Sequence, residues 1–109
     1  MKNTSTYNEK ILGTLADYMI LKMLNTSTRH ISTGMTGKEI ITRLRAYGLK
    51  INQSTIYAMF GRLRRNGLIT KGRIETDYMS TEIAYYISKA GEKYLSSTKE
   101  FLESILKIQ

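Results

Sequence analysis

The chain has 109 residues, a single histidine, no cysteine and no proline, and it carries a net charge of +8 with a pI near 9.8. This length suits one domain with one core, and the missing cysteines exclude disulfide bonds, thiolate metal sites and thiol nucleophiles. No apolar run approaches the roughly 18 residues of a membrane span, and the start "MKNTSTYNEK" lacks the apolar core of a signal peptide. We therefore expect a cytoplasmic protein with no membrane partner.

The positive charge is concentrated in the middle of the sequence. No acidic residue lies between Glu39 and Glu75, whereas the parts of the chain outside this stretch balance nine basic against nine acidic residues. The basic residues of the stretch are Arg43, Arg45, Lys50, Arg62, Arg64, Arg65, Lys71 and Arg73. A run of one charge is usually a solvated face, but this concentration, with Tyr47 and Tyr57 interleaved, favours a polyanionic partner.

The first predicted helix runs from Asn8 to Leu24. Apolar residues recur there at helical spacing on more than one face, so we expect this helix to be buried on two sides. The polar segment 25–34 that follows predicts a loop, with room for one short strand around His30 to Ser32.

Two short helices come next, each with recognisable start and stop signals. The second helix opens at Thr36, where "TGKE" predicts a capping box with Glu39, and it stops at Gly48. The third helix begins at Asn52 as N-cap and ends at residues 66–67, where an asparagine is followed by a glycine.

After Gly67 the apolar pattern changes from helical to alternating. The runs "LITKGRI" and "EIAYYIS" predict two strands of a hairpin, the second with Ile83, Tyr85 and Ile87 on one face. A hairpin this small must lie on the helices to be stable. A last helix is expected at 89–108.

This order of elements is typical of a winged helix-turn-helix domain. We predict a mainly α fold with a β-hairpin wing, as a single DNA-binding domain over residues 1–109. Its helix-turn-helix spans 36–66 and its wing spans 68–88.

The third helix has two opposite faces on a helical wheel. Ile56, Phe60 and Leu63 cluster within about 60°, with Met59 at the edge, and are expected to face the core. Glycine in a helix interior costs roughly 1 kcal/mol relative to alanine, so Gly61 indicates close approach of another molecule. A helix entering the roughly 12 Å wide major groove needs such approach, and we predict a base pair near Gly61. The face opposite the core consists of Ser54, Ala58, Gly61 and Arg65, with Tyr57 and Arg62 on its shoulders.

Cations outside the third helix extend the predicted contact surface. Lys71 and Arg73 share a strand face and could hold the DNA backbone. Each of them alone could equally be a charged residue that protects an edge strand from pairing with another molecule. Lys38 lies in the first turn of the second helix, where free amides attract phosphate. The predicted DNA contacts are Lys38, Asn52, Gln53, Ser54, Thr55, Tyr57, Ala58, Gly61, Arg62, Arg65, Lys71 and Arg73.

The segment "STIYAMFGRLRRNGLI" resembles the recognition helix of the PadR-like winged-helix proteins, whose pattern is roughly T-L-Y-x-x-L-x-R-L-x-x-x-G-L-I. The matching residues are Thr55, Ile56, Tyr57, Phe60, Arg62, Leu63, Gly67, Leu68 and Ile69. Upstream "TGKEIITRL" and downstream "AYYISKAGEKYL" resemble two further segments of the family. The resemblance therefore covers most of the chain from Gly37 to Leu95.

The resemblance implies a DNA-binding homodimer whose interface is built by the first and last helices, 8–24 and 89–108. It carries over Tyr57 and Arg62 as DNA contacts and Tyr85 as a packing residue of the wing. The dimer contacts expected on this basis are Ile11, Leu12, Leu15, Tyr18, Met19, Tyr94, Phe101, Leu102 and Ile105.

Three functions stay open at this point. A transcriptional regulator predicts a footprint confined to a promoter. A plasmid partition protein, a role that a PadR-like protein fills in an archaeal segregation system, predicts spreading along DNA and a further protein that bridges it to an ATPase. Outside DNA binding, the alternative is a basic module that meets an acidic protein or RNA.

The sequence does not predict an enzyme. The only histidine, His30, lies in a polar loop, and the acidic residues are scattered, so no metal site is expected. No glycine-rich phosphate loop is present, and we expect no cofactor.

Overall fold

The computed structural model describes residues 2–27, 34–75 and 80–109, and of residues 2–12 and 27 it describes only the helical backbone. The predicted order of helices and hairpin is confirmed, while the first helix is longer than predicted at both ends. The strand expected around 30–32 lies outside the described residues. In chain order the elements are α1 (Lys2–Ser27), β1 (Met35–Thr36), α2 (Gly37–Ala46), α3 (Gln53–Arg65), β2 (Ile69–Glu75), β3 (Thr81–Ile87) and α4 (Lys89–Leu106).

The helix boundaries follow from residues that satisfy the free backbone groups at helix ends. Thr36 Oγ1 accepts from the Glu39 amide at 3.2 Å, and Glu39 Oε1 accepts from the Thr36 amide at 3.3 Å, so the predicted capping box is confirmed. The helices α2 and α3 stop before Gly48 and Gly67, whose φ angles of 89° and 73° lie in the left-handed region. Ser88 caps α4 through its hydroxyl oxygen.

The sheet has three antiparallel strands in the order β1, β3, β2. The strands β2 and β3 form the predicted hairpin, in which Ile69 lies opposite Ile87 and Glu75 opposite Thr81. The strand β1 pairs with the other edge of β3, so the sheet is wider than the two-stranded wing expected from the sequence. A strand of two residues is too short to show alternation, and it is stabilised only by this long-range pairing.

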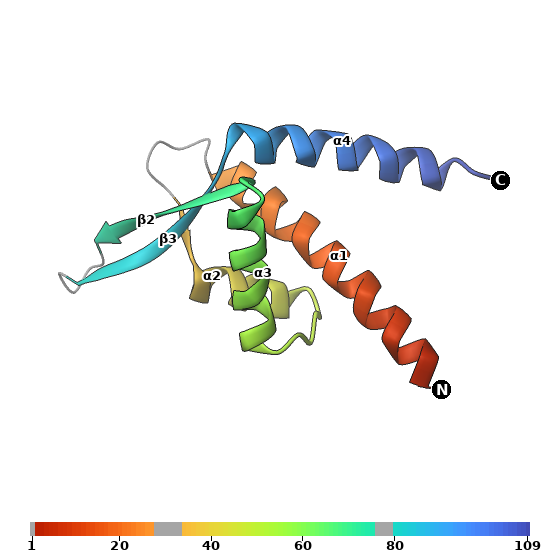
Figure 1. The fold of residues 1–109 in the computed structure, drawn as a ribbon, viewed down its shortest axis with the longest axis horizontal. Coiled ribbons are helices and arrows are strands. Elements are labelled where there is room, and N and C mark those ends of the chain that lie inside the picture. Colours follow the sequence, from red (N-terminus) through yellow and green to blue (C-terminus); the bar gives the residue numbers. More distant parts are fainter. Residues whose placement is uncertain (1, 28–33, 76–79) are drawn as a thin grey trace.

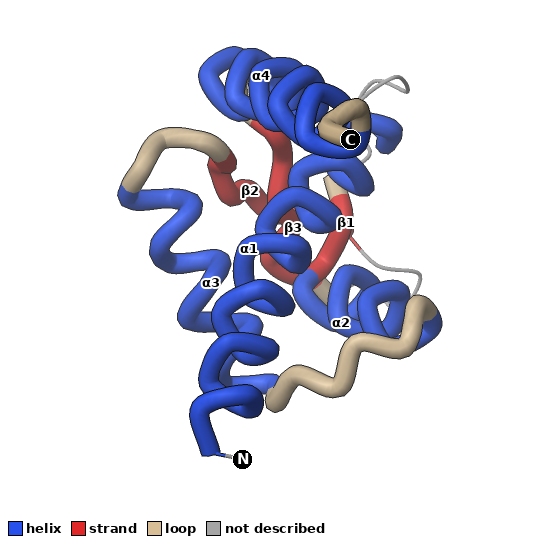
Figure 2. Tube along the Cα trace, turned by 90° about the vertical axis from the view of Figure 1, so that its right-hand side faces the viewer, coloured by secondary structure: helices blue, strands red, loops and turns tan. Residues whose placement is uncertain are grey.

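The hairpin projects from one side of the helical body, and the free ends of α1 and α4 project from the other side (Figure 1). Viewed from the side of those free ends, α1 lies between α2 and α3, while α4 lies apart from both (Figure 2). The molecule is therefore elongated, with extents of 52 × 30 × 25 Å. Because α3 leads directly into β2, the third helix and the hairpin are neighbours in space.

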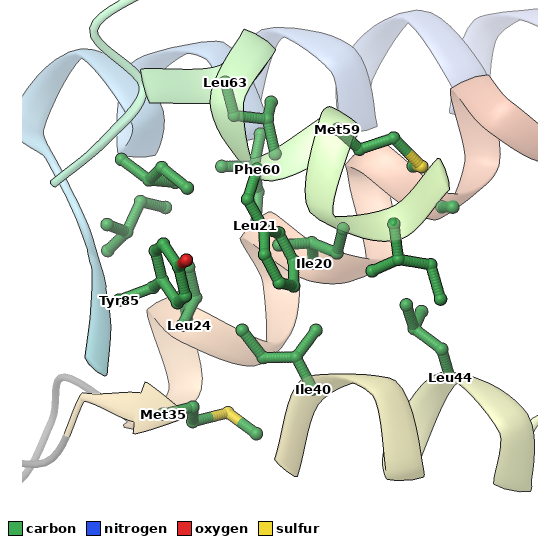
Figure 3. Close-up of a cluster of buried hydrophobic side chains, with 14 of the residues drawn as sticks. Ile20, Leu21, Leu24, Met35, Ile40, Leu44, Met59, Phe60, Leu63 and Tyr85 are labelled. Atoms are coloured by element: carbon green, nitrogen blue, oxygen red, sulfur yellow. The ribbon is translucent and has the colours of Figure 1, made fainter. Parts of the chain in front are cut away.

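The core lies where α1, α2 and α3 meet one face of the sheet (Figure 3). The predicted core residues of the third helix, Ile56, Phe60 and Leu63, are all buried, and so is Met59. Burying a side chain of this size contributes about 1.5–3 kcal/mol, so the core fixes which face of α3 points outward. The fully buried partners from α1 and α2 are Ala16, Ile20, Leu21, Leu24, Ile40 and Leu44.

One expectation about an apolar face is corrected by the fold. Within a single chain α1 is buried on one face only, because Leu15 is exposed and Tyr18 and Met19 are half-buried. On β3 the register places Ile83, Tyr85 and Ile87 on one face, as predicted. Tyr85 and Ile87 are buried, while Ile83 is 47% exposed. Ile83 lies nearer the end of the hairpin than Tyr85 and borders the hollow that Lys38 and Tyr57 also line.

Candidate nucleic-acid interface

The outer face of α3 carries the residues that were expected to read DNA. Its N-terminal turn is held by Asn52 Oδ1, which accepts from the Ser54 amide at 2.8 Å, the Thr55 amide at 3.3 Å and the Ser54 hydroxyl at 2.6 Å. Because the Ser54 hydroxyl donates its proton to Asn52, it can act toward a ligand only as a hydrogen-bond acceptor. The exposed residues of this surface are Asn52, Gln53, Ser54, Thr55, Tyr57, Ala58, Arg62, Arg65, Lys38, Lys71 and Arg73.

Gly61 lies in the centre of the outer face, between the two shoulders of the helix. Among the described residues, a Cβ atom added to Gly61 would approach only the Nη1 atom of Arg65, at 3.5 Å. This is an ordinary van der Waals distance, so packing within the chain does not require glycine at this position. The close approach of another molecule therefore stays the prediction that accounts for Gly61.

Tyr57 forms one shoulder of α3 and lies over the first turn of α2. Its ring meets Phe60 edge-on, with centroids 5.4 Å apart and an interplanar angle of 85°. A Cβ atom on Gly37 would lie 3.0 Å from the Tyr57 hydroxyl oxygen, so the ring closely covers the N-terminus of α2. Tyr57, Lys38 and Glu82 line one hollow of about 400 Å³ between α2, α3 and β3. The fold thus brings together Lys38 and Tyr57, which are distant in the sequence.

Arg62 forms the other shoulder and is paired with α1. Its Nη2 atom lies 2.5 Å from Oδ2 of Asp17, which precedes it by 45 residues. Burial raises the pKa of the Asp17 carboxyl, and the hydrogen bond and charge of Arg62 oppose this shift. The sequence predicts Arg62 as a DNA contact and contains no signal for its pairing with Asp17. No local pattern relates the two residues, because the pair depends on how α1 packs against α3.

The wing places its cations on the side of the sheet that faces the helices. Lys71 lies opposite Tyr85 and Arg73 opposite Ile83, and directly opposed residues in an antiparallel pair share a face. The same face begins at Ile69, which is buried against the core. Along β2 this face therefore changes from apolar to cationic as the hairpin leaves the helices.

Two exposed basic residues outside the predicted contacts lie on the same side of their helix as a predicted contact. Arg64 is exposed seven residues after Tyr57, which places it on the same side of α3. Burial and then Tyr57 raise the pKa of the Tyr85 phenol, and the charge of Arg64 opposes them. Arg45 is exposed seven residues after Lys38 on α2. A helical repeat of seven was the signal that could have identified both.

Seven of the nine residues expected at a dimer interface have described side chains, and all seven are apolar or aromatic residues of α1 and α4 that stay at least partly exposed. Leu15, Tyr94, Phe101 and Ile105 are 40%, 48%, 55% and 45% exposed. Tyr18, Met19 and Leu102 are half-buried. The side chains of Ile11 and Leu12 lie outside the described part of the chain.

Other kinds of site find no support in the parts of the chain that the structure describes. Within them, no three acidic, histidine or cysteine side chains come together in a way that could hold a metal ion. None of the described helices is long and apolar enough to cross a membrane. His30 lies outside the described residues.

The three-helix core, the antiparallel sheet with its projecting hairpin and the fourth helix form a winged helix-turn-helix fold of the PadR-like type. A transcriptional regulator from Clostridium thermocellum is 27% identical with a TM-score of 0.71, over 90% of this chain and 89% of that one. A PadR-like transcriptional regulator from Bacillus cereus is 18% identical with a TM-score of 0.72, over 92% and 99%. A PadR family transcription regulator from Clostridium difficile is 19% identical with a TM-score of 0.71, over 84% and 91%.

By sequence alone, no family model and no curated protein matches the chain. The likeness is therefore one of fold, shared with structures that are transcriptional regulators. These structures give no support to a plasmid partition role or to a protein- or RNA-interaction module.

Proposed function

We propose that this protein is a transcriptional regulator that binds double-stranded DNA at specific sequences and acts as a homodimer in the cytoplasm, associated with the nucleoid. The observation that carries the proposal is the outer face of α3, which is exposed, basic and formed at its centre by small residues. It lies in a fold shared with PadR-like regulators. The proposal involves no catalytic step and no cofactor.

In the proposed complex α3 enters the major groove. Ala58 and Gly61 let the helix approach closely, while Ser54 and Arg65 reach base edges. Lys38 and Tyr57 contact one phosphate at the hollow beside the start of α2, and the wing cations hold the neighbouring backbone. The proposed contacts are Lys38, Asn52, Gln53, Ser54, Thr55, Tyr57, Ala58, Gly61, Arg62, Arg65, Lys71 and Arg73.

The proposed dimer covers the apolar surface that a single chain leaves exposed on α1 and α4. Large apolar side chains that stay in water forgo the stabilisation of burial, and Phe101 and Ile105 of α4 are about half exposed. The C-terminal part of α4 projects away from the other helices (Figure 1). A second copy of the chain that packs on these helices would bury them and place two copies of α3 on one duplex. The proposed interface residues are Ile11, Leu12, Leu15, Tyr18, Met19, Tyr94, Phe101, Leu102 and Ile105.

The test is to select duplexes from a randomised pool with the full chain and to footprint the best of them. We expect two half-sites related by two-fold symmetry, about 10 bp apart or a multiple of that distance. Single-stranded DNA and double-stranded RNA serve as competitors over a salt series. Equal competition by all three nucleic acids would contradict the proposal, and a footprint that spreads far beyond the site would favour a partition function instead.

A further inference from the structure

Arg62 is exposed enough to meet a ligand, yet one edge of its guanidinium is already bound within the chain. Its side chain is 48% exposed, and its Nη2 atom donates to Asp17 at 2.5 Å. A guanidinium carries five N–H donors in a planar fork, so one hydrogen bond to a carboxylate leaves donors on its other edges free. The bond to α1 therefore restricts the directions in which those donors can point.

Asp17 lacks the hydrogen-bond partners that a buried structural carboxylate normally has. Its side chain is 20% exposed, and its Oδ1 atom is buried with no hydrogen-bond partner among the described residues. A buried carboxylate oxygen without a donor is unfavourable, and an apolar residue at this position of α1 would avoid it. A gain in stability therefore does not account for a carboxylate at this position, where α1 packs against α3.

We infer that Asp17 is a positioning residue for sequence recognition, which holds Arg62 so that its free edge faces the base edges of bound DNA. This inference rests on the proposed function. An unrestrained arginine can swing to any nearby phosphate, whereas the bidentate contact with the O6 and N7 atoms of guanine needs one orientation of the fork. Asp17 thus favours base reading over indiscriminate phosphate binding by the same side chain.

A simpler effect of Asp17 would be to repel DNA through its negative charge. Glu82 provides the matched control, because it is an exposed acid that lines the hollow beside Tyr57 and forms no ion pair with Arg62 in the described structure. Glu82→Gln removes the same charge, but from beside the Tyr57 shoulder of α3 rather than the Arg62 shoulder. Charge repulsion alone predicts that both substitutions strengthen binding to all duplexes equally.

The experiment compares wild type, Asp17→Asn, Asp17→Ala, Glu82→Gln, Arg62→Gln and the double variant Asp17→Ala/Arg62→Gln. Each is titrated over a salt series against the duplex selected by the wild type and a scrambled duplex of the same composition. For Asp17→Ala we expect the ratio of the two affinities to fall about tenfold, the size of one lost base contact. For the scrambled duplex we expect the salt slope to steepen by up to about 0.9, because Arg62 is free to bind one more phosphate.

Asp17→Asn keeps an acceptor for Arg62 and should lose less specificity than Asp17→Ala, which also guards against a variant that fails to fold. In the Arg62→Gln background, Asp17→Ala should have no further effect on the affinity ratio. Three outcomes would overturn the inference. The first is that Asp17→Ala lowers the affinity ratio equally in the Arg62→Gln background, and the second is that neither Asp17 variant changes the ratio. The third is that Glu82→Gln lowers the ratio as much as Asp17→Ala does. If the wild type itself selects no sequence, the proposed function fails rather than the role of Asp17.

Discussion

The ring of Phe60 lies against the ring of Tyr85, with centroids 4.7 Å apart and planes inclined by 41°. Phe60 belongs to α3 and Tyr85 to β3, so one aromatic contact joins the third helix to the wing (Figure 3). Both rings are buried, at 1% and 9% exposure. This packed contact therefore helps to hold the outer face of α3 and the cations of the wing in their relative positions, together with the hydrogen bonds of the turn between α3 and β2.

Removing this contact should destabilise the whole domain. For Tyr85→Ala we expect the free energy of unfolding to fall by about 2–4 kcal/mol, because a large buried side chain is lost and a cavity is left. Ile83→Ala, on the same strand but largely exposed, should change it by less than about 1 kcal/mol. Urea denaturation followed by circular dichroism measures both, and equal losses would contradict the assignment of Tyr85 to the core.

Gly61 should lower the stability of α3 and raise the affinity of the protein for DNA. Gly61→Ala should raise the free energy of unfolding by up to about 1 kcal/mol, since the added methyl group meets only the end of a flexible arginine. Gly91→Ala is the contrasting variant, because its Cβ would overlap the Leu68 carbonyl oxygen, and we expect a loss of about 1–3 kcal/mol or more.

Substitutions at Gly61 should also change DNA affinity without unfolding the protein. Gly61→Leu should stay folded but bind the selected duplex at least about tenfold more weakly, because the side chain would hold α3 away from the bases. Thermal unfolding and a binding titration are run on the same preparation. Unchanged affinity in both Gly61→Ala and Gly61→Leu would show that no base pair comes close to this residue.

Neutralising Lys71 and neutralising Arg65 should have different effects on DNA binding. Lys71→Gln should weaken the selected and scrambled duplexes alike and flatten the salt slope by about 0.9, as expected for one lost phosphate contact. Arg65→Gln should also lower the ratio of the two affinities, because it loses a base contact. Lys107→Gln, at the far end of α4, controls for net charge. Indistinguishable behaviour of the first two variants would refute this division of roles.

The dimer proposed from the exposed surface of α4 can be tested without DNA. Phe101→Glu places a charge among apolar side chains at the proposed interface, and we expect the protein to sediment as a monomer and to bind a two-site duplex much more weakly. Glu100→Gln on the neighbouring, exposed position of the helix should leave the assembly state unchanged. Sedimentation velocity distinguishes the two, and a wild type that is already monomeric at binding concentrations would rule out the interface.

The stability of the domain should depend on Asp17 in a direction set by its pKa. Burial raises the pKa of Asp17 above its usual 3.8, so the folded protein holds the proton more tightly than the unfolded chain. This contribution favours folding below about pH 4 and is lost as the pH rises through the raised pKa. At pH 7 the ionised carboxylate therefore disfavours the fold relative to a neutral isostere.

We accordingly expect Asp17→Asn to unfold at the same or a higher temperature than the wild type at pH 7, with the difference shrinking toward pH 4. Thermal unfolding at a series of pH values measures this, with Glu82→Gln as the exposed comparison. A variant that is markedly less stable than the wild type at pH 7 would mean that the ion pair with Arg62 stabilises the fold.

Much of the local structure could be predicted because its causes are local. The capping box of Thr36 and Glu39 and the glycine stops at Gly48 and Gly67 depend on residues within a few positions of one another. The core face of α3 follows from its helical period in the same way. The strand β1 could not be predicted, because two residues become a strand only through pairing with β3.

The sequence by itself determined the order of helices and hairpin, the positive charge between Glu39 and Glu75, and the residues on the outer face of α3. The tertiary structure alone decided that Lys71 and Arg73 lie on the helix-facing side of the sheet and that Arg62 is bound to Asp17. The physical reason is that periodicity and capping act over one or two turns of a chain. Which charges meet is instead decided by the packing of a shared core, between residues as far apart as 45 positions.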